Sequence, residues 1–233
     1  MKGGTGSGKV NSHFFETVED GFKKAGFTIT SGIWLDGYER IYENAVRKFH
    51  EETRQRAREN HTHPVMEGMG IMILEPEYNL PLDVEGDTVI YVLVRTSGEG
   101  NERTVEAGDI LLTESEKCTI LELKERYRRF LLVLNVGGVV DISLVLEVEN
   151  ILILSQLGVQ TGCVLADLVL GKTCLSGKLT TTWTRWSDYP GFISFGEKDD
   201  TRYEGGYTWV TGILTASERN TFPILIRTVL YII

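Results

Sequence analysis

Hydrophobic residues along the chain fall into two kinds of pattern, helical spacing and short continuous runs. Near the start they recur at helical spacing, at Phe14, Val18 and Phe22. Asn11 or Ser12 can cap this helix and Gly26 can end it. Phe27–Thr30 then has the composition of a short strand. This part of the sequence therefore predicts a helix followed by a strand.

A second and longer helix is predicted from about Leu35 to Arg58. Its apolar residues share one helical face: Tyr38, Ile41, Tyr42, Ala45 and Phe49. The stretch 61–87 contains proline, glycine and methionine but no sustained period. We expect a loop or an irregular connection there.

Three later segments are continuous apolar runs, which are typical of strands buried on both faces. They are Thr88–Val94, Phe130–Val136 and Asn150–Leu154. Thr113 and Glu116 form a capping box that opens a helix to about Arg129. A further helix, Gly162–Leu170, ends at Gly171.

This alternation predicts an α/β fold, a three-layer sandwich with a mostly parallel sheet between helices. In such sheets ligands bind beyond the carboxyl ends of the strands. The loops that follow Val94, Val136 and Leu154 should therefore share one edge of the sheet.

Composition narrows the function classes. The 233 residues are enough for one large domain, and the formal net charge of −9 argues against a nucleic-acid or membrane partner. The three cysteines lack metal-ligand spacing, which favours free thiols in a reducing compartment. No leader opens the chain, and the apolar run Phe222–Ile233 is interrupted by Arg227 and too short to span a membrane. We expect a cytoplasmic protein without a metal or organic cofactor.

Three motifs carry little weight. The opening GGTGSGKV is close to a phosphate-binding loop, but Val10 stands where a magnesium-binding hydroxyl is needed, and no strand precedes the glycines. His61 and His63 lack a carboxylate or thiol partner at metal-ligand spacing. Ser176 has no sequence sign of a partnered histidine and aspartate.

The segment 95–103, RTSGEGNER, follows the best strand at its carboxyl end. Its glycines flank one carboxylic acid, Glu99, and allow a ligand to approach the backbone closely. Cleavage of a glycosidic bond needs an acid that protonates the leaving oxygen, and Glu99 is placed for that role. An exposed loop glutamate near Arg103 is the simpler interpretation, and these residues alone favour it.

Longer stretches resemble a known family. RTSGEGNERTVEAGDILLTESE, FLLVLNVGGVVDIS and ADLVLGKTCLSGKLTTTW are similar to the α/β-sandwich domain of glycoside hydrolase family 3, above all its bacterial β-glucosidases. The opening KGGTGSGKVNSHFFETVEDGFKKAGFTIT resembles the part of that domain after its first strand. The resemblance runs from about Gly3 to Glu204.

The resemblance implies a retaining β-glycosidase that acts on β-linked glucosides or oligosaccharides. In that family an aspartate nucleophile lies on a separate TIM-barrel domain, and the sandwich domain supplies the acid/base, which corresponds to Glu99. Ser97, Gly98 and Arg103 would bind substrate, with Arg103 orienting the loop or Glu99. The first strand of the family domain has no counterpart in this sequence, and the barrel would have to act in cis or in trans.

Departures from the family pattern leave an alternative open. Ser155 stands where the family has a tryptophan, and Leu175, Thr180 and Thr184 replace prolines. We therefore keep a second hypothesis, in which the chain is a degenerate, non-catalytic fragment or a weak carbohydrate-binding module.

We assign 1–204 to the sandwich domain and 205–233 to an atypical tail. One coding of Gly206–Ala216, read two letters later, gives Ile-Tyr-Val-Gly-Tyr-Arg-Tyr-Phe-Asp-Ser, which is close to the family pattern at this position. The tail is thus predicted to be an out-of-frame reading of a family-type gene.

Overall fold

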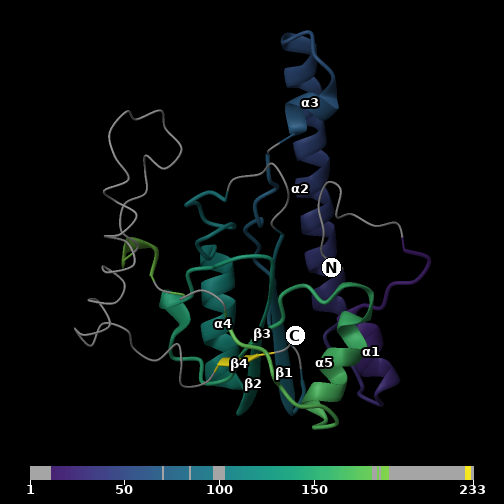
Figure 1. Ribbon diagram of the computed structural model, residues 1–233, viewed down its shortest axis with the longest axis vertical. Helices are drawn as coiled ribbons and strands as arrows, with labels where there is room; N and C mark the ends of the chain where they lie inside the picture. Colours follow the sequence, from purple (N-terminus) through teal and green to yellow (C-terminus); the bar gives the residue numbers. More distant parts are fainter. Residues whose placement is uncertain are drawn as a thin grey trace.

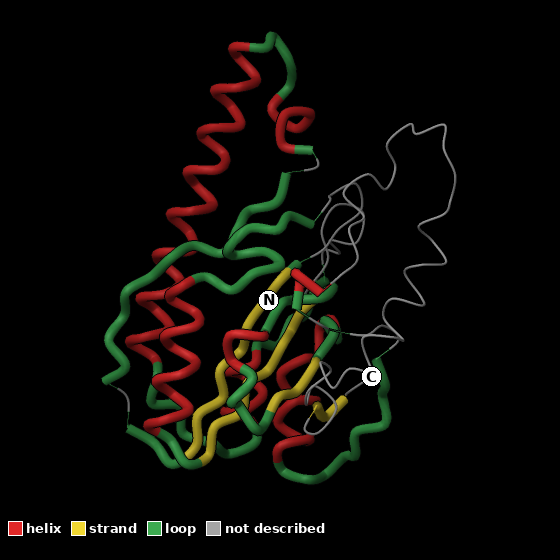
Figure 2. The backbone as a smooth tube through the Cα atoms, turned by 90° about the vertical axis from the view of Figure 1, so that its left-hand side faces the viewer, coloured by secondary structure: helices red, strands yellow, loops and turns green. Residues whose placement is uncertain are grey.

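The computed structural model describes residues 12–69, 71–83, 85–96, 103–179, 183, 185–188 and 229–231. Its centre is a parallel sheet whose strands lie side by side in the order in which they occur along the chain (Figure 2). The strands are β1 (Thr88–Arg95), β2 (Arg129–Val136), β3 (Ile151–Ile153) and β4 (Val229–Tyr231). The first three are the predicted strands. The fourth comes from the tail and pairs with β3.

Helices cover both faces of the sheet (Figure 1). One face carries α4 (Glu114–Arg126), and the other carries α1 (Val18–Lys24) and α5 (Thr161–Val169). Alternate residues of β2 pack against the helices on opposite faces of the sheet. Leu132 and Leu134 lie in the core beneath α4, whereas Val133 packs with α1 and α5. The predicted α/β sandwich with a parallel sheet is confirmed.

The strands differ in how far they are buried. β2 is buried along nearly its whole length, as its apolar sequence predicts. β1 is equally apolar but mostly half-buried. Within the described ranges β1 pairs only with β2, so its other edge carries no strand. A row of unpaired backbone groups at such an edge is open to further strand pairing.

The first helix begins later than predicted. Its N-cap is Thr17, whose hydroxyl accepts from the backbone N–H of Asp20 while the Asp20 carboxylate accepts from the backbone N–H of Thr17. This reciprocal capping box satisfies the backbone N–H groups of Thr17 and Asp20. Ser12 precedes the helix and does not cap it. Phe14 precedes the helix and is half-exposed, and Asn11 lies outside the described residues. Gly26 ends the helix with φ of 94°, as predicted.

The predicted strand Phe27–Thr30 is wrong. These residues form no strand, and the Phe27 side chain is 37% exposed. A strand exists only where a neighbour accepts its backbone hydrogen bonds, and no such neighbour lies beside this segment in the described part of the chain. Local composition therefore favoured a conformation that the surroundings do not support.

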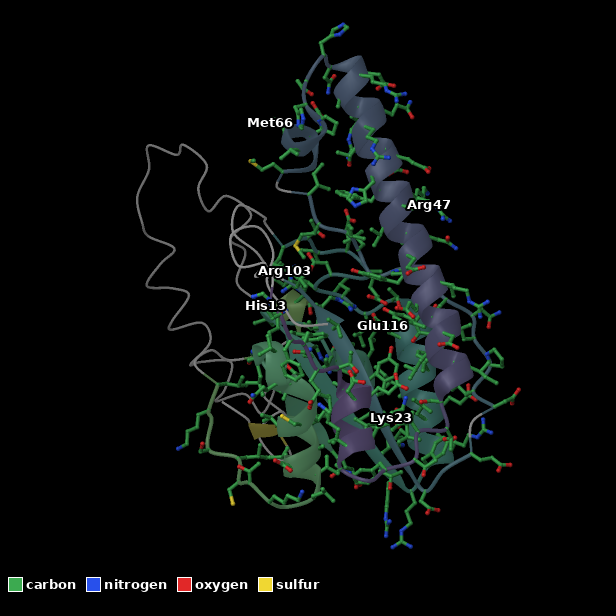
Figure 3. The ribbon with its side chains drawn as sticks, turned by 90° about the vertical axis from the view of Figure 1, so that its right-hand side faces the viewer. His13, Lys23, Arg47, Met66, Arg103 and Glu116 are labelled. Carbon is green, nitrogen blue, oxygen red and sulfur yellow. The ribbon has the colours of Figure 1, made fainter. Side chains whose placement is uncertain are left out.

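The long helix is α2 (Gly32–Glu59), which extends the predicted range at its start. Its far end projects from the body together with the short α3 (Pro64–Gly68), and Figures 1 and 3 show the pair as an arm that carries Arg47 and Met66. The base of α2 packs through aromatic rings: Trp34 stacks on Tyr38, and both meet Tyr78 edge to face. Tyr78 belongs to the irregular segment 71–83, which thus joins α2 to the body.

The remaining helices agree with the sequence patterns. The Thr113–Glu116 capping box opens α4 as predicted, and the helix ends at Arg126 because Arg129 already begins β2. α5 is followed by Gly171 with φ of 69°, the expected helix stop. Short 3-10 turns complete the described elements: η2 (Ser143–Val145), η3 (Gly158–Gln160) and η4 (Trp186–Asp188).

Candidate functional site

The loops after β1, β2 and β3 meet at one edge of the sheet. The carbonyl oxygen of Arg95 accepts a hydrogen bond from the Gly137 N–H, 3.1 Å away, and another from Gln156 Nε2, 2.9 Å away. These three residues follow or end the three strands. The predicted shared edge is therefore confirmed for the described residues.

The backbone after β3 is unusual. Ser155 and Gln156 both have positive φ, at 23° and 57°, which is uncommon for residues with a side chain. Asn135, buried in β2, accepts from the Gln156 N–H at 3.1 Å and helps to hold this conformation. Ser155, which replaces the family's tryptophan, is exposed.

Ser97, Gly98 and Glu99, three of the four predicted site residues, lie in the segment 97–102, outside the described residues. Its two flanks are described. On one side, β1 ends at Arg95 and is followed by Thr96. On the other side, the next described residue is Arg103.

On the first flank, Arg95 and Glu116 form a buried ion pair. Both side chains are at most 3% exposed, and the guanidinium is bidentate, with Nη1–Oε1 at 2.8 Å and Nη2–Oε2 at 2.6 Å. Burial alone would lower the pKa of Arg95, but the hydrogen bonds and charge of Glu116 outweigh it and the pKa is raised. Because Glu116 also accepts from the Thr113 N–H in the capping box, the end of β1 is tied to the start of α4.

On the second flank, Arg103 pairs with Asp109, whose side chain is 1% exposed. The Arg103 Nε donates to Asp109 Oδ1, and the Thr104 N–H donates to Asp109 Oδ2 at 2.5 Å. Figure 3 shows Arg103 beyond Glu116, toward the projecting arm. The buried Arg103 Nη2 has no partner among the described residues.

A half-buried carboxyl group, that of Glu75, lies beside these flanks and was not predicted. Its backbone N–H donates to the Gly108 carbonyl at 3.0 Å, and its side chain accepts from the Tyr38 hydroxyl. Burial raises the pKa of Glu75 to about 7, and the nearby charge of Glu116 adds to the rise, while the Tyr38 hydrogen bond and the Arg95 charge oppose it. In the sequence, the only sign that the Glu75 side chain is half-buried is that its neighbours along the chain are apolar.

The described residues contain no metal-ligand cluster and no membrane-spanning helix. No group of three histidine, cysteine, aspartate or glutamate side chains in the described ranges is arranged as metal ligands. Within the described ranges, no helix is both long and apolar enough to cross a membrane.

The chain has relatives among known proteins. Residues 1–214 match the model of the glycosyl hydrolase family 3 C-terminal domain. Beta-glucosidase A of Butyrivibrio fibrisolvens is 30% identical over 263 aligned positions, which cover 96% of this chain and 29% of that protein. A beta-glucosidase of Ruminococcus albus is 27% identical, over 85% of this chain and 20% of that protein.

A solved structure is also similar. Beta-glucosidase 3B from Thermotoga neapolitana, in complex with alpha-D-glucose, superimposes with a TM-score of 0.59 and 29% identity. The superposition covers 85% of this chain and 27% of the other. The chain thus spans less than a third of the length of each of these proteins.

Proposed function

Because the chain belongs to glycosyl hydrolase family 3, as its C-terminal domain, we propose that it supplies the general acid/base of a retaining β-glycosidase that hydrolyses β-linked glucosides. Glu99 is the acid/base, and the nucleophile comes from a TIM-barrel domain outside this sequence. The observation that supports the proposal is that β1, which SGEG follows closely in the sequence, ends at the edge of the sheet where β2 and β3 also end.

The chemistry of the reaction fits one carboxyl group at this position. In a retaining mechanism one carboxyl group protonates the leaving oxygen and later deprotonates water, while a second attacks the sugar. An acid of this kind works best with its pKa raised toward neutrality. We propose that partial burial against the barrel raises the pKa of Glu99 in the assembled enzyme.

The proposed substrate-binding residues are Ser97, Gly98 and Arg103. Arg103 is held by Asp109 through Nε, which leaves Nη2 without a partner in the described part of the chain. A guanidinium fixed at one nitrogen and unpaired at another can orient a carboxylate or a sugar hydroxyl. Arg103 would therefore contact Glu99 or the substrate through Nη2.

The test is an assay on an aryl β-glucoside with the purified chain, alone and together with the part of the Butyrivibrio relative that lies outside the aligned region. We expect no hydrolysis by the chain alone and hydrolysis by the combination. Glu99→Gln should then lower the rate by about 10²–10⁴-fold, the usual contribution of acid/base catalysis. Glu102→Gln, in the same segment, is the matched control and should leave the rate unchanged.

Three results would contradict the proposal. Hydrolysis by the chain alone, abolished by Glu99→Gln, would show that no second domain is needed. A combined activity that Glu99→Gln leaves intact would remove Glu99 from the chemistry. Sugar binding without hydrolysis in any combination would favour the non-catalytic, carbohydrate-binding alternative.

A further inference from the structure

Both flanks of the segment 97–102 bind the same residue, Asp109. On one side the Nε of Arg95 donates to the Asp109 backbone carbonyl at 2.9 Å. On the other, Arg103 and Thr104 donate to the Asp109 carboxylate, with Thr104 doing so through its N–H at 2.5 Å and its hydroxyl at 3.2 Å. One residue thus joins the end of β1 to the point where the chain returns.

Asp109 is itself held in a fixed turn. Gly108 has φ of 90°, and a Cβ there would lie 2.6 Å from the Glu75 carbonyl oxygen, so this turn packs directly on the backbone of Glu75. Next to Asp109, Ile110 donates to the Thr104 carbonyl and accepts from the Asp141 N–H at 2.8 Å. The position of Asp109 is therefore set by this turn and its contacts with Glu75 and Asp141.

The charges also match. The buried Asp109 carboxylate faces the Arg103 guanidinium, and the neighbouring Arg95 guanidinium is neutralised by Glu116. Every described hydrogen bond to the Asp109 carboxylate comes from Arg103 or Thr104. Among the described residues, the carboxylate thus binds only the two that directly follow the segment 97–102.

We propose that Asp109 is a positioning residue, which fixes both ends of the segment 97–102 and thereby the place of Glu99. The inference rests on the proposed function for its catalytic meaning. Asp109 does not touch the reacting atoms. Its role is to keep the acid at one distance from the leaving oxygen, which matters because small displacements of a catalytic group cost large factors in rate.

Asp109→Asn is the natural variant because it keeps the shape and replaces one acceptor oxygen with an NH₂ that must face a donor. In the chain itself, amide hydrogen exchange at Thr104 and in 97–102 should become at least about tenfold faster, since either Arg103 or Thr104 loses its acceptor on Asp109. Exchange of the β2 amides should change little. Unchanged exchange at Thr104 would overturn the inference.

A matched control separates positioning from general stability. Val145→Ala, in the α4 core with 0% exposure, lowers stability elsewhere and should speed exchange in β2 without a selective effect on 97–104. If Asp109→Asn instead accelerates β2 and 97–104 to the same extent, its role is merely structural and the inference is wrong.

The assembled enzyme gives the catalytic test. Asp109→Asn should lower kcat by about tenfold or more for an alkyl glucoside, whose leaving oxygen needs a proton, and less for a nitrophenyl glucoside, with KM little changed. Equal losses for both substrates would contradict positioning of the acid. If Glu99→Gln itself shows no leaving-group dependence, the proposed function fails, and the exchange result still decides whether Asp109 fixes the segment.

Discussion

Three carboxyl groups that are wholly or partly buried have different partners and therefore different roles. Glu116 is paired with Arg95 and Asp109 with Arg103. Among the described residues, the half-buried Glu75 side chain accepts only from a neutral hydroxyl, that of Tyr38. A buried charge without an opposite partner is costly, so a carboxyl group in that position keeps its proton to higher pH. Glu75 therefore links the stability of the fold to pH.

The Glu75→Gln variant tests this link. The pKa of Glu75 is about 7 in the folded chain and 4.5 as a reference. Between these values the folded state binds more protons than the unfolded state, so its stability falls as pH rises from about 4.5 through 7. Glutamine does not ionise, and the variant should be more stable than the parent chain by up to about 3 kcal/mol at pH 8, and by little at pH 4.

Urea unfolding at several pH values measures this difference. Glu122→Gln, an exposed glutamate of α4, is the control and should leave the pH dependence unchanged. A Glu75→Gln chain whose stability falls with pH as steeply as the parent's would show that Glu75 ionises freely in the folded state.

Single residues were also the hardest to predict from sequence. Glu99 could be singled out because glycines surround it and a buried strand precedes it. Asp109 could not, because its importance comes from Arg95 and Thr104, which approach it through hydrogen bonds that no spacing reveals. Arg103 was assigned to the site, but its partner Asp109 was found only in the structure.

Among the elements, α1 and α5 pack with their backbones in direct contact. A Cβ on Gly21 would lie 2.1 Å from the backbone carbon of Gly162, and a Cβ on Gly162 would lie 1.9 Å from the Thr17 carbonyl oxygen. No side chain fits at either position. The two glycines let the helix backbones meet and bury the apolar residues on either side, Phe22, Leu165 and Ala166.

Gly162→Ala should therefore separate α1 from α5. Forcing a methyl group into such a contact costs about 3 kcal/mol, and we expect the urea midpoint to fall accordingly. Gly32→Ala is the control, because an added Cβ there meets nothing within 4 Å, and its effect should be below about 1 kcal/mol. Equal stability of the two variants would show that the helices are not held in close contact in solution.

Helices and strands were predicted correctly where the sequence held a long apolar run or a capping box of two residues. The continuous apolar runs of β1 and β2 and the Thr113–Glu116 capping box each left one interpretation. The predicted start of α1 was wrong because Ser12 and Thr17 are both acceptable caps. Only the structure shows that Thr17 is extended and caps the helix, and that the Glu16 N–H before it donates to the Val159 carbonyl. Phe27–Thr30 failed because a strand depends on a neighbour that composition cannot supply.

At the scale of the whole molecule, the assignment of 205–233 to an atypical tail stays a prediction. The family match ends at 214, and the described part of the tail is the short β4, parallel to β3. We predict that the DNA after the codon for Gly205 encodes a Tyr-Val-Gly-Tyr-Arg pattern in another reading frame. Sequencing that DNA is the measurement, and the absence of this pattern from every frame would contradict the prediction.

The double hydrogen bond at the Arg95 carbonyl has a consequence for how such a fold can vary. One donor comes from the loop after β2 and the other from the loop after β3. Together they set the orientation of the last peptide plane of β1, a short distance in the sequence before SGEG. An insertion that displaced Gly137 or Gln156 would remove a donor from that carbonyl, so we expect the loops after β2 and β3 to tolerate few changes in length near these two residues.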